Sequence, residues 1–164
     1  MSGIGHVGEI DVIEYLTKQH KMDICLPFKD KGLGFIGLNN GNHFEFQVKT
    51  SKFQKGSYFW FDIYKSKMIY SDKTFYVFVC FTMPRRQFMQ SKRNFFLVPS
   101  MQLKKWIDRK ELSSKKGNDN CFNIFLYPNE KEKTWIYKNK GKYFDWTKYW
   151  NNFECLEYGT YDHN

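Results

Sequence analysis

Several features that would assign this chain to a familiar class of protein are missing from its sequence. The amino terminus has neither the charged nor the apolar region of an export signal, and no apolar run approaches the roughly 20 residues of a membrane-spanning helix. The four cysteines are spread widely and form no C-x-x-C pair: Cys25, Cys80, Cys121 and Cys155. We therefore expect a soluble, cytoplasmic protein with reduced thiols and neither a disulfide framework nor a zinc site.

Common catalytic motifs are missing as well. The histidines have no metal-ligand spacing among themselves or with the cysteines, and no Ser-His-Asp arrangement or nucleophile elbow is visible. Gly32-x-Gly34-x-x-Gly37 matches a dinucleotide-binding fingerprint in form. It lies in a predicted hairpin with no helix after it, so the structural context of that motif is not met.

Aromatic residues and lysine are abundant. Of the 164 residues, 41% are hydrophobic and 20% aromatic, which suits a single folded domain rich in strands. The 26 Lys and Arg residues exceed the 17 Asp and Glu residues, giving a net charge of +9. A polyanion such as nucleic acid is the natural partner for this charge. An AT-rich genome would also enrich Lys, Asn, Phe and Tyr.

The stretch Asn42–Ser51 predicts a strand with two unlike faces. Phe44, Phe46 and Val48 alternate with His43, Glu45, Gln47 and Lys49, so the apolar set faces a core and the polar set faces the other way. Burying such polar groups without partners costs several kcal/mol. The polar face therefore indicates either a solvated edge strand or a functional site.

The rest of the chain predicts an α+β fold in a single domain, with a mixed sheet flanked by helices. The first helix carries a buried stripe of Ile10, Ile13 and Leu16, with Val12 and Tyr15 beside it and Asp11 pointing elsewhere. Ser100 is expected to cap a second helix. The expected strands are 23–28, 33–38, 43–50, 58–64, 74–81, 95–98 and 121–127, with a flexible segment at 113–120 and a last helix at 145–156 whose aromatic residues enter the core.

Two short motifs together resemble the PD-(D/E)XK nuclease superfamily, and particularly its small prokaryotic and Holliday-junction-resolvase-like members. They are Gly8-Glu9 on the first helix and Phe46-Gln47-Val48-Lys49-Thr50-Ser51 at the end of the hairpin. The resemblance covers residues 3–52 at the level of motifs, and implies one restriction-endonuclease-like domain over 1–164, with additional elements over 58–156. It also implies metal-dependent hydrolysis of DNA phosphodiester bonds, in which Glu9 and Gln47 hold Mg²⁺ or Mn²⁺ and Lys49 serves the attacking water.

The sequence departs from the family pattern at one metal-binding position. Gly34 stands where the family carries an Asp on the second strand, and Gln47 supplies a neutral oxygen. Asp30 in the preceding turn, or Glu45 on the polar face, are the candidates to complete the metal site. The alternative is a catalytically inactive nuclease fold that acts as a nucleic-acid-binding or protein-interaction module.

A basic loop supplies candidate phosphate contacts, Arg85, Arg86, Lys92 and Arg93. A solvated loop without a ligand is the other interpretation of these residues. DNA is the expected partner, and the family resemblance also allows a homodimer.

Overall fold

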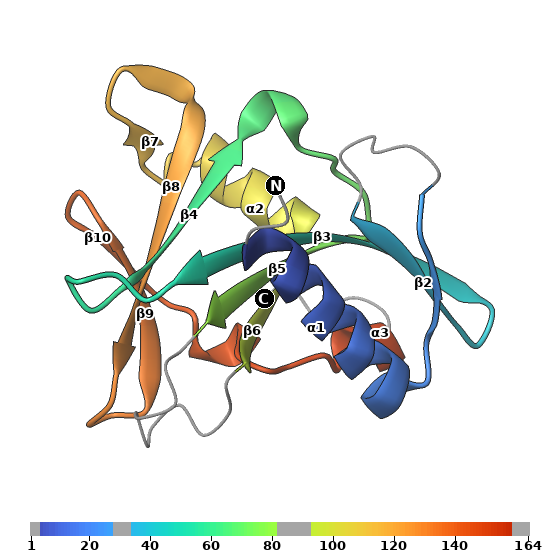
Figure 1. Ribbon diagram of the computed structural model, residues 1–164. Helices are drawn as coiled ribbons and strands as arrows, with labels where there is room; N and C mark the ends of the chain where they lie inside the picture. Colours follow the sequence, from blue (N-terminus) through green and yellow to red (C-terminus); the bar gives the residue numbers. More distant parts are fainter. Residues whose placement is uncertain (1–3, 28–33, 82–92, 159–164) are drawn as a thin grey trace.

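Two five-stranded sheets form the framework of this α+β protein (Figure 1), whose computed structural model describes residues 4–27, 34–81 and 93–158. The first sheet has the strand order β1-β2-β3-β5-β6, and the second has the order β10-β9-β8-β4 with β7 paired to β8. The first sheet comprises β1 (Asp23–Cys25), β2 (Phe35–Asn39), β3 (Asn42–Lys52), β5 (Thr74–Phe81) and β6 (Arg93–Pro99). The second comprises β4 (Phe59–Tyr64), β7 (Ser114–Lys115), β8 (Asn118–Asn129), β9 (Thr134–Asn139) and β10 (Lys142–Asp145).

The first sheet is mixed, as the sequence predicts, but the expectation of one sheet flanked by helices was wrong, because a second sheet packs beside the first. β3 runs parallel to β5. The other neighbouring pairs of this sheet, β1 with β2, β2 with β3 and β5 with β6, are antiparallel. β5 is an interior strand between β3 and β6: its alternate residues face opposite sides, and seven of its eight residues are buried. A strand buried on both faces is largely apolar, which explains the apolar run that follows Thr74 in this strand.

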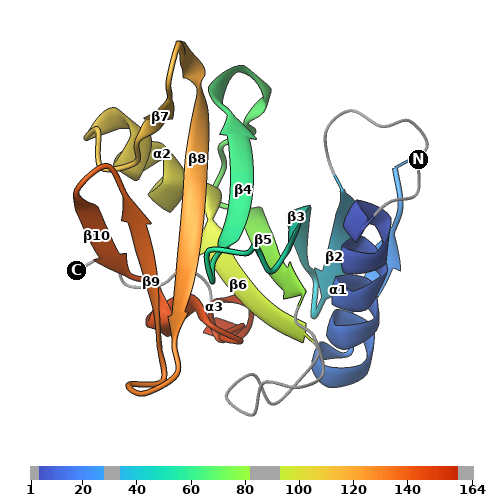
Figure 2. The same ribbon diagram turned by 60° about the vertical axis from the view of Figure 1, so that its left-hand side comes forward.

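Helices and the second sheet cover the two faces of the first sheet. α1 (Ile4–His20) lies on the side away from the second sheet, whereas α2 (Ser100–Asp108) lies on the other side (Figure 2). Two hydrophobic cores result. One joins α1 to residues such as Phe46 and Val77, and the other joins α2 and the second sheet to residues such as Phe78.

The hairpin before the polar strand is confirmed. Asn40 and Gly41, between β2 and β3, have φ values of +49° and +79°. Positive φ at both central residues is the geometry of a type I′ turn, whose twist matches the twist of paired strands. Asn39 pairs with Asn42, so this turn fixes which residues of β3 share a face.

The buried stripe of α1 differs from the predicted one. Ile10 is 49% exposed, whereas Asp11 is only 7% exposed and the fully buried side chains are Val12 and Leu16. The stripe is rotated because Gly8 lies against β3, where a Cβ would overlap Thr50 Oγ1. The helix therefore approaches the sheet along the line of Gly8, Val12 and Leu16.

Three further expectations were wrong. Ser100 does not cap α2, since its hydroxyl donates to Ser71 O at 2.9 Å. The segment predicted to be flexible contains β7 and a turn at Gly117, which lead into β8. The predicted last helix is replaced by β10, η2 (Thr147–Tyr149) and α3 (Cys155–Tyr158). Its aromatic residues still enter the cores: Trp146, Tyr149 and Phe153 are at most 4% exposed.

Candidate functional site

The polar face of β3 is directed away from α1. Phe44 and Phe46 share a core with α1, so the alternate residues Glu45, Gln47 and Lys49 face the side of the sheet on which the second sheet lies. Gln47 is only 8% exposed, and Glu45 and Lys49 are half-buried. This face is therefore an interior polar surface and not a fully solvated edge.

Lys49 lies in an electrostatic environment that disfavours its charge. Burial lowers the pKa of its ammonium group, and the nearby charge of Lys67 lowers the pKa further, while Asp62 raises it. The net shift is downward. A lysine with a lowered pKa binds its proton less tightly, which suits a group that accepts a proton. It also suits a group whose charged form a bound anion would stabilise.

Asp62 is a carboxylate near Lys49 that the sequence did not single out. Its Oδ1 accepts hydrogen bonds from the Trp60 indole Nε1 at 2.8 Å and from the Asn123 side-chain amide. β4 is held to the end of β3 by a further bond, from Trp60 N to Ser51 Oγ at 2.9 Å. The polar face of β3 thus continues onto the outer side of β4.

Glu9 is not on the same side of the sheet as Lys49. Its helix packs on the face that carries Thr50 and Phe46, and Figure 2 shows α1 on the far side of the first sheet. The structure therefore brings Gln47 and Lys49 together on one face and places Glu9 on the element that covers the opposite face.

Gly34 has a steric role. Its N–H donates to Phe46 O at 3.0 Å, and a Cβ at this position would lie 2.7 Å from the same oxygen. Real Cβ atoms do not approach a backbone oxygen so closely. An Asp at position 34, as the family pattern has, would require the backbone of β2 or β3 to move.

The oxygen ligands of the expected metal site are dispersed in the described part of the chain. Glu45 Oε2 accepts a hydrogen bond from Thr74 Oγ1 at 2.8 Å, which ties it to the start of β5. Asp30 lies outside the described residues. Across residues 4–27, 34–81 and 93–158, no three His, Cys, Asp or Glu side chains gather closely enough to hold a metal ion.

The basic loop was predicted to contact phosphates. Arg85, Arg86 and Lys92 lie outside the described residues, and Arg93 is the first residue of β6 and not part of a loop. Their roles stay a prediction.

The outer face of the second sheet is the other candidate site, and it is rich in aromatic side chains. Along β4 and β8, one set of alternate residues enters the core and the other set faces outward. Trp60 is 42% exposed and Tyr143 on β10 is 60% exposed. We define the outer aromatic face by its members: Tyr58, Trp60, Phe125, Tyr127, Ile136, Lys138 and Tyr143.

Contacts within the outer aromatic face hold the rings in fixed positions. Trp60 and Phe125 are cross-strand partners whose ring centroids are 5.8 Å apart, and Tyr58 lies 5.5 Å from Phe125 and 5.3 Å from Tyr127. Such cross-strand aromatic pairs stabilise the sheet on which they stand. The rings are therefore arranged before any ligand arrives.

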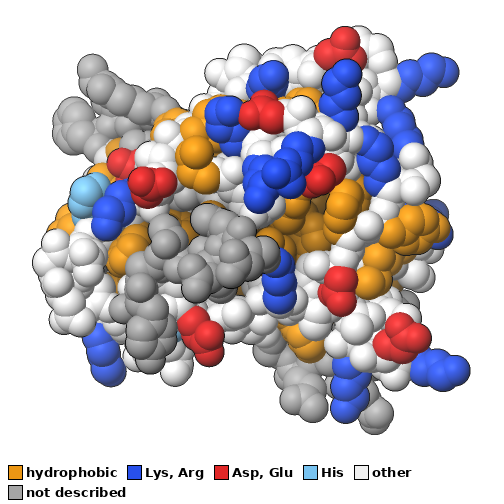
Figure 3. Space-filling model, turned by 180° about the vertical axis from the view of Figure 1, so that it is seen from behind, with side chains coloured by type: hydrophobic (Ala, Val, Ile, Leu, Met, Phe, Trp, Pro, Cys, Tyr) orange, Lys and Arg blue, Asp and Glu red, His pale blue; other side chains and the backbone are white. Residues whose placement is uncertain are grey.

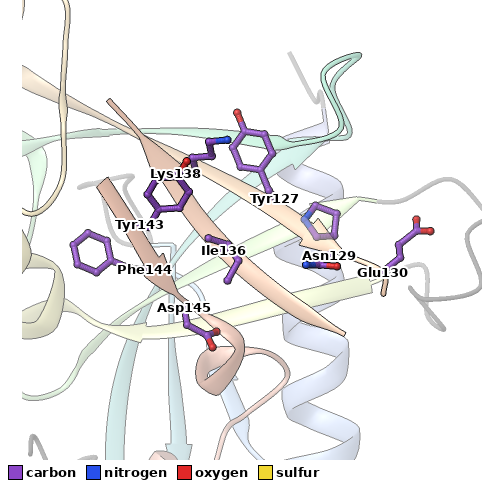
Figure 4. A pocket seen from close by; sticks show the side chains of 9 residues that line it. Tyr127, Asn129, Glu130, Ile136, Lys138, Tyr143, Phe144 and Asp145 are labelled. Atoms are coloured by element: carbon purple, nitrogen blue, oxygen red, sulfur yellow. The ribbon is translucent and has the colours of Figure 1, made fainter. Parts of the chain in front are cut away.

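Lys138 adds a positive charge to this face. Its Nζ lies 5.8 Å from the ring centre of Tyr127 and 5.4 Å from that of Tyr143. The three side chains border an open pocket of about 580 Å³, with Glu130 and Asp145 farther along it (Figure 4). Cation, rings and carboxylates occupy different parts of the same pocket.

Sequence reasoning missed the outer aromatic face although a signal for it was present. In Phe-Trp-Phe-Asp-Ile-Tyr, the sequence of β4, every second residue enters the core. The residues between them, Trp60 among them, must then face outward. Two large aromatic side chains on the outward face of neighbouring strands would have indicated a binding surface.

Comparison of the chain with protein-family models, curated proteins and solved structures finds no significant match. Among the described helices, none combines the length and the apolar character that a membrane crossing requires.

Proposed function

We propose that this protein binds single-stranded nucleic acid on the outer aromatic face without cleaving it. The observation that carries the proposal is the placing of Lys138 between the rings of Tyr127 and Tyr143, on the same sheet face as Trp60 and Phe125. In some RNA-binding modules, exposed aromatic residues on one face of a sheet stack unpaired bases. A duplex hides the faces of its bases, so the single strand is the form that this surface suits.

Base stacking and electrostatic attraction would both contribute to the affinity. Stacking of a base on an aromatic side chain contributes about 1–3 kcal/mol, and Trp60 and Tyr143 expose enough of their rings for this. The net charge of +9 attracts the phosphates from a distance. Lys138 offers a local phosphate contact, whereas Glu130 and Asp145 repel phosphates from the other part of the pocket.

Fluorescence anisotropy with short labelled thymidine and uridine oligomers tests the proposal. We expect binding to wild type that weakens with salt, with a slope of about −0.7 in log K against log salt for each phosphate contacted. The double variant Trp60→Ala/Tyr143→Ala should bind at least about tenfold more weakly, since two stacking positions are lost.

The matched control removes two apolar side chains that are exposed elsewhere, Leu26→Ala/Met101→Ala, at 67% and 40% exposure. This control should bind as wild type does. Binding that is equal in both double variants, or that favours duplex over single strand, would contradict the proposal.

A metal-dependent nuclease is the second candidate, favoured by one observation. Gln47 and Lys49 share a face, and the pKa of Lys49 is lowered there. Incubation of single-stranded and duplex DNA with the protein and Mg²⁺ or Mn²⁺ tests it. Cleavage by wild type that Lys49→Met abolishes would establish a nuclease. If the DNA stays intact in every condition, nucleic-acid binding is the only one of the two functions that remains.

A further inference from the structure

The pocket on the outer aromatic face has a positive end and a negative end. Lys138 on β9 and Tyr143 on β10 are cross-strand partners, and Ile136 and Asp145 are the next outward pair along the same two strands. Residues two apart on a strand lie about 7 Å from each other. Figure 4 shows Lys138 beside the ring of Tyr143, with Asp145 beyond Ile136. The ammonium group and the carboxylate are therefore separated along the pocket.

The floor of this pocket is an accessible apolar surface. Ile136 is half-buried, and its cross-strand partners are Tyr127 on β8 and Asp145 on β10. Tyr127 is half-buried as well, and Tyr143 is 60% exposed. Two strand spacings, about 10 Å, separate the backbone of Tyr127 from that of Asp145. A flat base can lie over Ile136 within this width.

Asp145 is held in a defined orientation and keeps one oxygen for a ligand. Its Oδ1 accepts a hydrogen bond from Thr147 N at 2.8 Å, at the start of η2. Within the residues that the structure describes, no donor bonds to Oδ2 and no cationic side chain pairs with this carboxylate. Asp145 is exposed. A carboxylate accepts hydrogen bonds and donates none, so this end of the pocket suits a ligand group that donates them.

Positive charge on this protein does not distinguish one base from another. In the view from behind, Lys and Arg side chains are spread over the surface with Asp and Glu side chains between them (Figure 3). Phosphates are alike in every nucleotide, so contacts to them carry no sequence information. Selection of a base requires a group that meets the edge of the base.

Asp145 is the polar side chain of the pocket that is placed for this contact. The amide of Asn129 is engaged elsewhere: its Oδ1 accepts from Glu132 N at 3.2 Å, and its Nδ2 donates to Glu132 Oε2 at 3.2 Å. Figure 4 shows the side chain of Glu130 directed away from Ile136. Lys138 stands at the other end, where it meets a phosphate in the proposed binding mode.

We propose that the outer aromatic face selects guanine through Asp145. This inference rests on the proposed binding of single strands to the same face. Guanine is the standard base whose Watson–Crick edge presents two adjacent donors, N1–H and the N2 amino group, and one carboxylate accepts both. Adenine and cytosine place an acceptor nitrogen beside their amino group, and thymine and uracil flank their one donor with carbonyl oxygens. Asp145 would repel these acceptors.

The direction of the strand follows from the two ends of the pocket. The Watson–Crick edge of a base lies opposite the sugar that carries the phosphates. A guanine whose phosphate meets Lys138 and whose rings lie over Ile136 would therefore present that edge to Asp145. Rings, phosphate and base edge would each meet a different part of the pocket.

Fluorescence anisotropy with labelled thymidine oligomers that carry a single central guanine, hypoxanthine, adenine or cytosine tests the assignment. The guanine strand should bind about tenfold more tightly than the strand of thymidine alone, as expected for a bidentate contact to a base edge. Hypoxanthine keeps N1–H and lacks the N2 amino group, so its strand should bind more weakly than the guanine strand. The adenine and cytosine strands should show no preference over thymidine.

Asp145→Asn is the test variant because it changes the contact and keeps the local fold. Its side-chain oxygen can still accept from Thr147 N, but an amino donor replaces the other acceptor. The preference for guanine should fall to less than about twofold. Asp72→Asn is the control: it changes the net charge equally, at an exposed position outside the pocket, and should keep the preference.

Asp145→Ser provides a second variant if Asp145→Asn does not fold, because a serine hydroxyl can also accept from a backbone N–H in this position. It should lose the preference as well. The assignment is overturned if wild type binds guanine and thymidine strands equally, if hypoxanthine binds as tightly as guanine, or if the folded Asp145 variants keep the preference. Each of these results leaves strand binding itself intact, whereas failure of every strand to bind would overturn the proposed function together with this assignment.

Discussion

The two sheets of this protein differ in how they are covered. The first sheet carries α1 on one face and meets α2 and the second sheet on the other, so β5 is buried on both sides. The second sheet buries one face only, and no described helix or strand covers its outer aromatic face (Figure 2). Aromatic residues occur on both kinds of face, but the covered ones stabilise the fold and the uncovered ones are available to a ligand.

The largest expected difference between the two kinds of face concerns tryptophan. Trp146 is fully buried and its ring lies 5.3 Å from that of Trp106, so Trp146→Ala should lower the free energy of unfolding by about 3–5 kcal/mol. Trp60→Ala removes an exposed side chain and should cost less than about 1 kcal/mol. Urea unfolding followed by circular dichroism measures both. Equal losses would show that the outer aromatic face is structural.

A smaller effect is expected where α1 meets the first sheet. Gly8→Ala places a methyl group against Thr50 Oγ1 and should cost about 1–3 kcal/mol by overpacking. Gly5→Ala is the control: it lies on the same helix, nothing lies within 4 Å of its Cβ position, and Ala should stabilise the helix by up to about 1 kcal/mol. Opposite signs in urea unfolding are the expected result, and a stabilising Gly8→Ala would contradict this packing of α1.

Stability should also fall at high pH because of tyrosines on the covered faces. Burial raises the pKa of Tyr76 and of Tyr149 to about 12. The unfolded chain therefore loses these protons from about pH 10 upward, while the folded chain keeps them until about pH 12. The free energy of unfolding should decrease as pH rises between these values, and Tyr76→Phe should flatten that decrease. A decrease that Tyr76→Phe leaves unaltered would contradict the burial of this hydroxyl.

The smallest effect is expected at Lys49, on the polar face of β3. Its pKa is lowered, so the folded state disfavours the charged form. Stability should therefore rise as pH increases from the folded pKa toward the usual pKa of lysine, and Lys49→Met should stabilise the protein by up to about 1 kcal/mol at neutral pH. Thermal unfolding measures this change. A marked loss of stability would show that Lys49 is held by a partner that compensates for its burial.

Local signals predicted several elements of the fold. The Asn-Gly turn determined the hairpin because positive φ at two successive residues admits few other structures. The apolar run of β5 identified an interior strand because a strand buried on both faces is largely apolar. Alternation along β3 correctly placed Gln47 and Lys49 on one face.

Features that depend on distant contacts were not predictable. Trp146, Tyr149, Trp150 and Phe153 recur at helical spacing, yet they enter two different cores from an irregular segment. Asp62 came near Lys49 only because β4 is held to the end of β3 through Ser51. The placing of Glu9 depended on which face of the sheet α1 covers, and this cannot be derived from the periodicity of either element. The expected homodimer stays a prediction that light scattering can test.

Tryptophan fluorescence tests most directly whether bases stack on the outer aromatic face. Trp60 is 42% exposed, whereas Trp106, Trp135 and Trp146 are at most 8% exposed and Trp150 is half-buried. A saturating single strand should quench the emission of wild type, and Trp60→Phe should remove most of that quenching while the protein stays folded. Quenching that persists unchanged in Trp60→Phe, or that duplex DNA produces equally well, would contradict the central claim.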